Sequence, residues 1–375
     1  MREEEEEDRG DAEEGAERRG GRKERMGKSM KRIVGTAVIW LSACGAPGKS
    51  AGEATRLARE LGYLVVPASE TSYYRFEELA LSEHMQNGET KALPFAPAPP
   101  GRPLASACDA KSGTAAVAYS KALAALDLVE GQTKWLPVEW PVEPRILSVS
   151  GTLAATVAGD DLSVWRVRDA KLLWRESSAA WLKAHGLKQI DYVLPLSPDE
   201  FLLVASKPVG FASAARLFAF HVSRAAGDWQ SSNDHQIPEI SNLHRITSDG
   251  QDLYLAGVEE QTRPGHGGGP ELIQTLAVVR LSAKDFSRTV LVKEELHQLE
   301  TDVEDLTGGP GWVGVVLRDG QTKGHELRIY RTGTAPGAAR VVYNKSLPTV
   351  LGASWISENL AAVWGAGAAE FVELP

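Results

Sequence analysis

Few side chains in this sequence stand at spacings that could carry out chemistry. The chain has eight histidines, which are His84, His185, His221, His235, His244, His266, His297 and His325. No two of them have the i, i+4 spacing of a zinc-binding helix, and none pairs with a cysteine at metal-ligand spacing. We therefore expect no metal site and no cofactor. The sequence assigns no catalytic residue.

Two acidic clusters offer carboxylates that could ligate calcium or act as paired acid and base. The first is Asp160-Asp161, which follows a glycine and precedes an alternating apolar segment, so we interpret it as a turn. The second comprises Asp302, Glu304 and Asp305. We interpret this cluster as a solvated face, because charge runs usually face water.

Residues 259–272 form the longest polar interruption in the domain, and they include three consecutive glycines. Loops of this length in a compact domain are either functional or disordered. The glycine content favours disorder. If the loop does bind a ligand, its candidate binding residues are Arg263 and His266.

The segment from Ala43 to Ser50 fits a loose form of the phosphate-binding loop, in which Gly48, Lys49 and Ser50 would contact a nucleotide. Such a loop requires a parallel sheet and a strand that ends in a magnesium-binding Asp. The nearest candidate strand, Leu123–Asp127, lies among short strands with no helical pattern around it. A nucleotide hydrolase is therefore the third of three functional interpretations.

A second interpretation of the amino terminus concerns export. Residues 1–29 contain almost no apolar side chain, so we expect them to be disordered or to precede the true start. Lys31 and Arg32 then stand before an apolar run that ends at Ala43. That run has about eleven residues, whereas a membrane-spanning helix needs about twenty. The order of charged, apolar and small residues is typical of a cleaved export signal.

The end of the run, Leu41-Ser42-Ala43-Cys44, resembles the lipobox of bacterial lipoproteins. The resemblance implies that residues 30–43 are a signal peptide cut between Ala43 and Cys44, and that the Cys44 thiol carries a diacylglyceryl group. Two or three acyl chains anchor a protein stably. Gly45 in place of Asp implies the outer membrane, on its periplasmic face, in a Gram-negative cell. Cleavage there would split the phosphate loop.

The remainder divides into a tether with a short helix at 44–61 and one large domain at 62–375. In that domain, short apolar runs alternate with Gly, Pro, Asp and Ser, and the chain holds 36 Gly and 20 Pro. We therefore expect an all-β fold. Cys108 would be the only thiol left after lipidation of Cys44, so no internal disulfide is expected.

The apolar runs recur in pairs, one continuously apolar and the next alternating, at intervals of roughly 40 to 60 residues. Two stretches, Ala124–Trp135 and Asp160–Trp174, resemble the WD-like and quinoprotein-like propeller families, with a strand, a turn with Asp or Gly, and then a Trp. The resemblance implies a β-propeller. Five full blades are expected at about 103–140, 145–178, 188–236, 240–295 and 301–346.

A sixth blade at 349–375 shows only three strands, and we expect Tyr63–Val66 or Tyr73–Phe76 to complete it. Six blades closed by this N-terminal strand are thus the predicted architecture. Seven blades are the first alternative, and a pair of two-sheet sandwiches is the second. The ten tryptophans are expected to pack mainly between blades.

The leading functional interpretation is a membrane-anchored lipoprotein whose propeller binds or scaffolds rather than catalyses. Its expected partners are the membrane, through the lipid anchor, and another envelope protein. The alternative is a propeller enzyme of the lactonase, glycan-active or quinoprotein type that acts at the central channel. The net charge of −9, without a clustered Lys/Arg surface, argues against nucleic acid as a partner.

Overall fold

The fold consists of seven antiparallel sheets, six of four strands and one of three. The computed structural model describes residues 61–109, 111–208, 215–225, 228–264, 270–296, 300–332, 339–349, 351–366 and 369–375. In every sheet, strands that follow one another in the chain are also neighbours in space. Each sheet is therefore a simple meander, which we call a blade.

The blades are numbered along the chain. Blade 1 consists of β1 (Tyr63–Ser69), β2 (Ser72–Glu77), β3 (Leu81–Met85) and β4 (Thr90–Ala92). Blade 2 consists of β5 (Pro103–Asp109), β6 (Thr114–Tyr119), β7 (Ala122–Asp127) and β8 (Gln132–Pro137). Blade 3 consists of β9 (Ile146–Ser150), β10 (Leu153–Ala158), β11 (Asp161–Arg166) and β12 (Lys171–Ser177). Blades 4 and 5 consist of β13 (Gln189–Ser197), β14 (Glu200–Pro208), β15 (Ala215–Ala225) and β16 (Asp228–Ile237), and of β17 (Leu243–Ser248), β18 (Asp252–Pro264), β19 (Pro270–Ser282) and β20 (Arg288–Leu296). Blades 6 and 7 consist of β21 (Thr301–Gly309), β22 (Trp312–Asp319), β23 (His325–Arg331) and β24 (Arg340–Leu347), and of β25 (Leu351–Ser357), β26 (Leu360–Gly365) and β27 (Ala369–Glu373).

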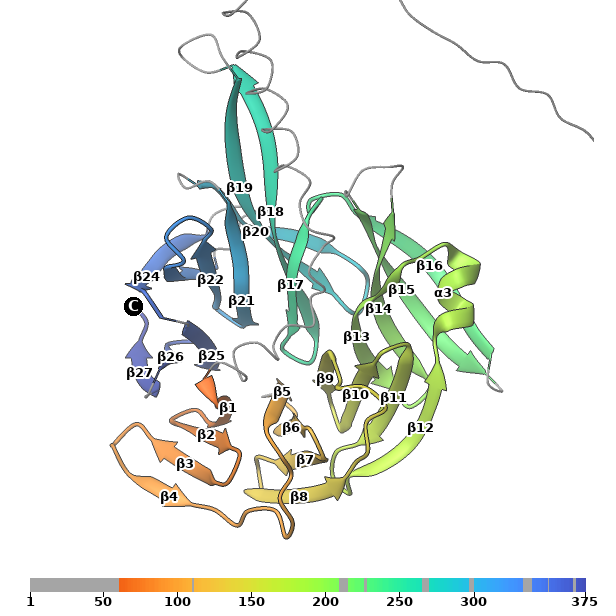
Figure 1. The fold of residues 1–375 in the computed structure, drawn as a ribbon, viewed down its shortest axis with the longest axis vertical. Helices are drawn as coiled ribbons and strands as arrows, with labels where there is room; N and C mark the ends of the chain where they lie inside the picture. Colours follow the sequence, from red (N-terminus) through yellow and green to blue (C-terminus); the bar gives the residue numbers. More distant parts are fainter. Residues whose placement is uncertain are drawn as a thin grey trace, which may run out of the picture. The chain divides into compact units, whose positions relative to one another are not determined.

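The blades form a closed ring around a central axis, with the first strand of each blade innermost (Figure 1). Each innermost strand contacts the innermost strand of both neighbouring blades, and β1 contacts β25 to close the circle. Hydrophobic clusters follow the same cycle, because every pair of adjacent blades shares one. No sheet can cover its own faces, so each blade is stable only between its neighbours. The expected β-propeller is confirmed.

The predicted number of six blades is wrong, because the structure has seven. Tyr63–Val66 and Tyr73–Phe76 do not complete the last blade. They belong to β1 and β2, which pair with each other and with β3 and β4 in a separate blade. The ring closes by packing instead of strand exchange: Ser354 Oγ of β25 donates a hydrogen bond to the Val65 carbonyl of β1, 3.1 Å away.

Burial explains why the other blades can be found in the sequence. The second strand of a blade is covered on both faces, as in β10, where all residues from Leu153 to Ala158 are buried. Outer strands alternate between exposed and partly buried positions, as in β8 from Gln132 to Pro137. The five predicted full blades each coincide with one four-stranded sheet, blades 2 to 6, and the predicted three-stranded segment is blade 7.

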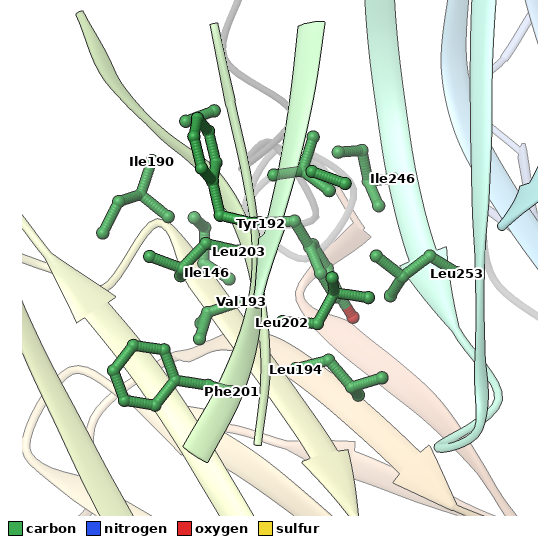
Figure 2. Close-up of a cluster of buried hydrophobic side chains, with 14 of the residues drawn as sticks. Ile146, Ile190, Tyr192, Val193, Leu194, Phe201, Leu202, Leu203, Ile246 and Leu253 are labelled. Carbon is green, nitrogen blue, oxygen red and sulfur yellow. The ribbon is translucent and has the colours of Figure 1, made fainter. Parts of the chain in front are cut away.

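The core between blades 3, 4 and 5 shows how the ring is filled (Figure 2). Val193 of β13 and Leu203 of β14 lie on the side of Ile146 of β9, whereas Leu194 and Leu202 lie on the other side of the sheet, towards Leu253 of β18. Tryptophans add contacts between blades: Trp312 of blade 6 is fully buried, and its Nε1 donates to the Ser357 carbonyl of blade 7 at 2.8 Å. The expected role of tryptophan in packing between blades is confirmed for this residue.

One helix that the sequence did not predict, α3 (Ala179–His185), joins blades 3 and 4. Trp181 and Leu182 on its inner face pack into the same core, and Gly186 ends it in a left-handed conformation at φ 64°. None of the residues described by the structure belongs to a helix with the length and apolarity needed to cross a membrane. The predicted helix at 51–61 and the signal segment at 30–43 lie outside the described residues, apart from Leu61.

Candidate ligand site in the central channel

A cavity of about 950 Å³ occupies the central channel and is lined by the innermost strands of all seven blades. Its lining mixes apolar side chains with a small number of charged ones. The charged side chains that line it are Glu70, Lys111, Arg145, Arg245, Asp249, Asp305 and Glu358. Cavities of this size with a few convergent polar groups are the usual sites for small ligands.

β-Bulges in three consecutive blades position the polar part of this lining. Near the channel, an extra residue interrupts the pairing of each of β13, β17 and β21 with the next strand, and β13 has a second interruption between Pro195 and Ser197. The bulged residues are Asp191, His244 and Glu304. A bulge bends its strand and redirects the side chains that follow it. The residues that come next along the chain, Tyr192, Arg245 and Asp305, all line the cavity.

Arg245 is held by the backbone of two bulges. Its Nε donates to the Glu304 carbonyl and its Nη1 to the His244 carbonyl, both at 2.7 Å. Beside it, burial raises the pKa of Asp305 to about 6, although the positive charge of Arg245 partly opposes this shift. The backbone N–H of Ala353 donates to Asp305 Oδ2 at 3.4 Å. Arg245 and Asp305 thus form an opposite-charge pair across blades 5 and 6.

Arg145, which immediately precedes β9, behaves differently. Its side chain forms no hydrogen bond or ion pair with any residue that the structure describes, and its Nη1 is shut off from solvent. Burial lowers its pKa, and the charges of Asp191 and Asp160 act in the opposite direction. Asp191 is engaged through Oδ1, which accepts a hydrogen bond from Gln189 Nε2 at 2.7 Å, whereas its Oδ2 is buried without a hydrogen-bond partner among the described residues.

The β17–β18 turn of blade 5 reaches across the channel to blades 2 and 3. Ser150 Oγ donates to the Gly250 carbonyl at 2.7 Å, and Lys111 Nζ donates to Gln251 Oε1 at 3.1 Å. The strand before this turn, β17, contacts both β5 and β9 on the far side. Figure 1 shows this turn close to those strands. The turn therefore forms one wall of the cavity.

The acidic cluster in blade 6 is not the solvated face that the sequence suggested. Glu304 is only 6% exposed and lies 2.7 Å from His325 Nε2 and 3.0 Å from Arg318 Nε. Asp302 accepts from Arg318 Nη2 at 2.6 Å. That prediction is wrong because the cluster forms an ionic network between strands, in which Glu304 is buried and Asp302 is partly exposed. Asp160, by contrast, lies in the β10–β11 turn, as expected for Asp160-Asp161.

The predicted disordered loop at 259–272 is also wrong for its described part. Residues up to Pro264 extend β18, and residues from Pro270 extend β19, so the hairpin projects beyond the ring (Figure 1). Arg263 is on this hairpin, 51% exposed, with its guanidinium 3.3 Å from Glu271 and 3.4 Å from Glu295. His266 lies outside the described residues.

The remaining predicted sites do not meet in the channel. Ala43 and Cys44, together with Gly48, Lys49 and Ser50, lie outside the described residues. The segment Leu123–Asp127, which the nucleotide loop would have needed in a parallel sheet, is part of β7 in an antiparallel blade. Among the described residues, no group of His, Cys, Asp and Glu could hold a metal ion, and no histidine lines the cavity.

Sequence reasoning missed the cavity lining. The signal that could have found it is a charged residue inside an inner strand, as at Arg245 in β17, which lines the cavity. Chemically, the arrangement offers hydrogen-bond donors, one carboxylate with a raised pKa and an apolar wall, which together suit reversible binding of a small molecule.

No protein-family model matches this chain, and no curated protein matches it. Several solved structures resemble it. The WD40 domain of Neurospora crassa Pan2 is 10% identical, with 81% of this chain and 88% of that one covered and a TM-score of 0.47. Kluyveromyces lactis Hsv2 is 11% identical, with coverage of 84% and 94% and a TM-score of 0.47. The N-terminal domain of Nup159 is 15% identical, with coverage of 68% and 72% and a TM-score of 0.35.

Proposed function

We propose that this protein is a lipid-anchored binding protein of the bacterial envelope, in which the propeller presents the projecting β18–β19 hairpin to another envelope protein. We call the part of the hairpin beyond the blade, residues 259–264 and 270–273, the arm. The observation that carries this proposal is the arm itself. A stable ring supports a two-stranded ribbon whose outer part pairs with no further strand within the described structure, although Arg263 contacts Glu295 of β20.

Among the residues that the structure describes, no further strand pairs with either edge of the arm. Pairing between β17 and β18 stops at Gly257, and pairing between β19 and β20 stops at Gln274. Glu260 through Pro264 are all exposed, and Leu272 is 43% exposed. Free strand edges can pair with a strand of another protein. Extended apolar edges aggregate, but the charges of Arg263 and Glu271 restrict which strand can add here.

The anchor follows from the sequence Leu41-Ser42-Ala43-Cys44. A lipid at Cys44 would leave the propeller on the tether at 44–61, close to a membrane surface and to other envelope proteins. The acidic composition favours a protein partner over a polyanion.

The test of the arm is site-specific photo-crosslinking in cells that make the full-length protein. A photoreactive residue at Leu272 should give a discrete crosslinked species with an envelope protein. The matched control is Leu79, which is 79% exposed on blade 1 and should give none. Equal adduct patterns from both positions, or no adduct from Leu272, would exclude the arm as the binding surface.

The anchor is tested separately by substitution of Cys44 with Ala. The variant should move from the membrane fraction to the soluble fraction or accumulate uncut, and it should no longer incorporate labelled fatty acid. Unchanged membrane association and labelling would contradict the lipoprotein assignment, whatever the crosslinking result.

A second candidate function, a propeller enzyme acting in the central channel, is favoured by one observation. A carboxylic acid with a pKa of about 6, such as Asp305, is suited to general acid–base work. Substitution of Asp305 with Asn should abolish hydrolysis of lactone or glycoside substrates if this candidate is correct. Lack of activity in the unmodified protein against both substrate classes counts against it.

A further inference from the structure

The guanidinium of Arg145 lines the cavity and has no hydrogen-bond or ion-pair partner among the described residues. Each arginine side chain carries five N–H donors in a planar fork. Of these, Nη1 is removed from solvent with no acceptor, and no other nitrogen of the group bonds to a described residue. No carboxylate of the described chain forms an ion pair with it; the nearest opposing charges act only at longer range.

A largely buried and unpaired cation is destabilising for a folded protein. The fold nevertheless places one in the channel, and the lowered pKa of Arg145 reflects this cost. An anion that enters from the cavity can accept hydrogen bonds from these unpaired N–H donors. The planar fork matches a carboxylate, which can accept two parallel hydrogen bonds.

The other two cations of the cavity are already engaged. Arg245 donates to two carbonyls and faces Asp305, and Lys111 donates to Gln251. Four carboxylates, Glu70, Asp249, Asp305 and Glu358, also line the cavity. A ligand with several negative charges would be repelled by these carboxylates. The site can therefore neutralise a ligand with one negative charge, through Arg145.

We propose that the central channel binds a small molecule with a single carboxylate and an apolar body, and that Arg145 is the residue that binds the carboxylate. The apolar body would lie against Ile146, Leu147 and Ala105, which line the cavity next to Arg145. This site is separate from the arm and does not depend on the proposed partner protein.

The probe for this proposal is 4-phenylbutyrate, with 4-phenylbutanol as its uncharged analogue and inorganic phosphate as a compact anion. Trp355 and Trp364 line the cavity, so tryptophan fluorescence of the full-length protein can report binding. We expect saturable binding of the carboxylate within about 10 mM, at least tenfold weaker binding of the alcohol, and no competition by phosphate.

Three variants identify the residue. Arg145→Gln should weaken carboxylate binding about tenfold to a hundredfold, and Arg145→Lys should weaken it less, because it keeps the charge but not the fork. The control Arg102→Gln removes an exposed arginine paired with Glu143 and should leave binding unchanged.

Stability provides a readout that does not depend on the probe. Because the Arg145 guanidinium has no partner in the part of the chain that the structure describes, Arg145→Met should keep or raise the unfolding midpoint in the absence of ligand. A lower midpoint would mean that Arg145 has a structural role and would overturn the proposal. It is equally overturned by undiminished binding to Arg145→Gln, by equal binding of the alcohol, by competition from phosphate, or by no binding of the carboxylate.

Discussion

Substitution of Gly250 with Ala tests the position of the turn that crosses the channel. Gly250 has a φ of +90°, and an added Cβ would lie 2.3 Å from Cγ and 2.5 Å from Cβ of Asp109. Asp109 cannot yield freely, because its Oδ2 accepts a hydrogen bond from the Gly151 backbone at 2.7 Å. The substitution must therefore strain the backbone and also displace a buried carboxylate.

The expected loss of stability is the sum of these two effects. A non-glycine residue at positive φ costs about 1–2 kcal/mol. Loss of a charge-assisted hydrogen bond adds about 1.5–3 kcal/mol. Gly250→Ala should therefore lower the free energy of unfolding by about 2.5–5 kcal/mol, measured by urea denaturation with tryptophan fluorescence.

Gly88 supplies a matched control. It has the same φ of +90°, but an added Cβ there would meet nothing within 4 Å. Gly88→Ala should cost only the backbone term, about 1–2 kcal/mol. Removal of the obstructing side chain in the double variant Asp109→Gly/Gly250→Ala should make the two losses less than additive. Equal losses for Gly250→Ala and Gly88→Ala would refute the contact between blades 2 and 5.

Three further predictions concern buried groups. The folded-state pKa of Asp305, about 6, is above its unfolded value. The contribution of this carboxyl to stability is therefore complete below about pH 4 and is lost as the pH rises through about 6. Asp305→Asn should make the free energy of unfolding less dependent on pH in this range and should stabilise the protein at pH 8 by about 2–3 kcal/mol. Burial raises the pKa of Cys108 to about 12, so iodoacetamide at pH 8 should label it only after unfolding, as mass spectrometry can show. Trp312→Ala should cost about 3–5 kcal/mol in urea denaturation, because the fully buried ring also bonds to Ser357; a loss below 1 kcal/mol would contradict its packing between blades 6 and 7.

The sequence predicted most blades because their inner strands are continuously apolar. In blade 3, for example, Leu153–Ala158 and Asp161–Arg166 are two strands separated by a Gly-Asp turn, and all of Leu153–Ala158 is buried as its apolar run predicts. The second strand is buried from residue 162 to 165, so its polar Ser163 is covered as well. Blade 1 was missed because its outer strands carry no such pattern. β3 has one fully buried residue, Leu81, and β4 is exposed throughout.

The candidate site was harder to predict because it depends on register. Alternation of apolar and polar residues assumes a side-chain period of two, which a bulge interrupts. Asp305 therefore lines the channel although the cluster around it reads as a surface segment. Whether Arg145 has an ion-pair partner depends on which side chains the neighbouring blades place beside it. The local sequence around Arg145 carries no information about those side chains.

The intact mass of the protein extracted from membranes tests whether the propeller is exported and held by a lipid. We expect a chain that begins at Cys44 and carries a diacylglyceryl group with a further acyl chain at its amino terminus. A soluble chain that still includes residues 30–43, without added lipid mass, would contradict this expectation.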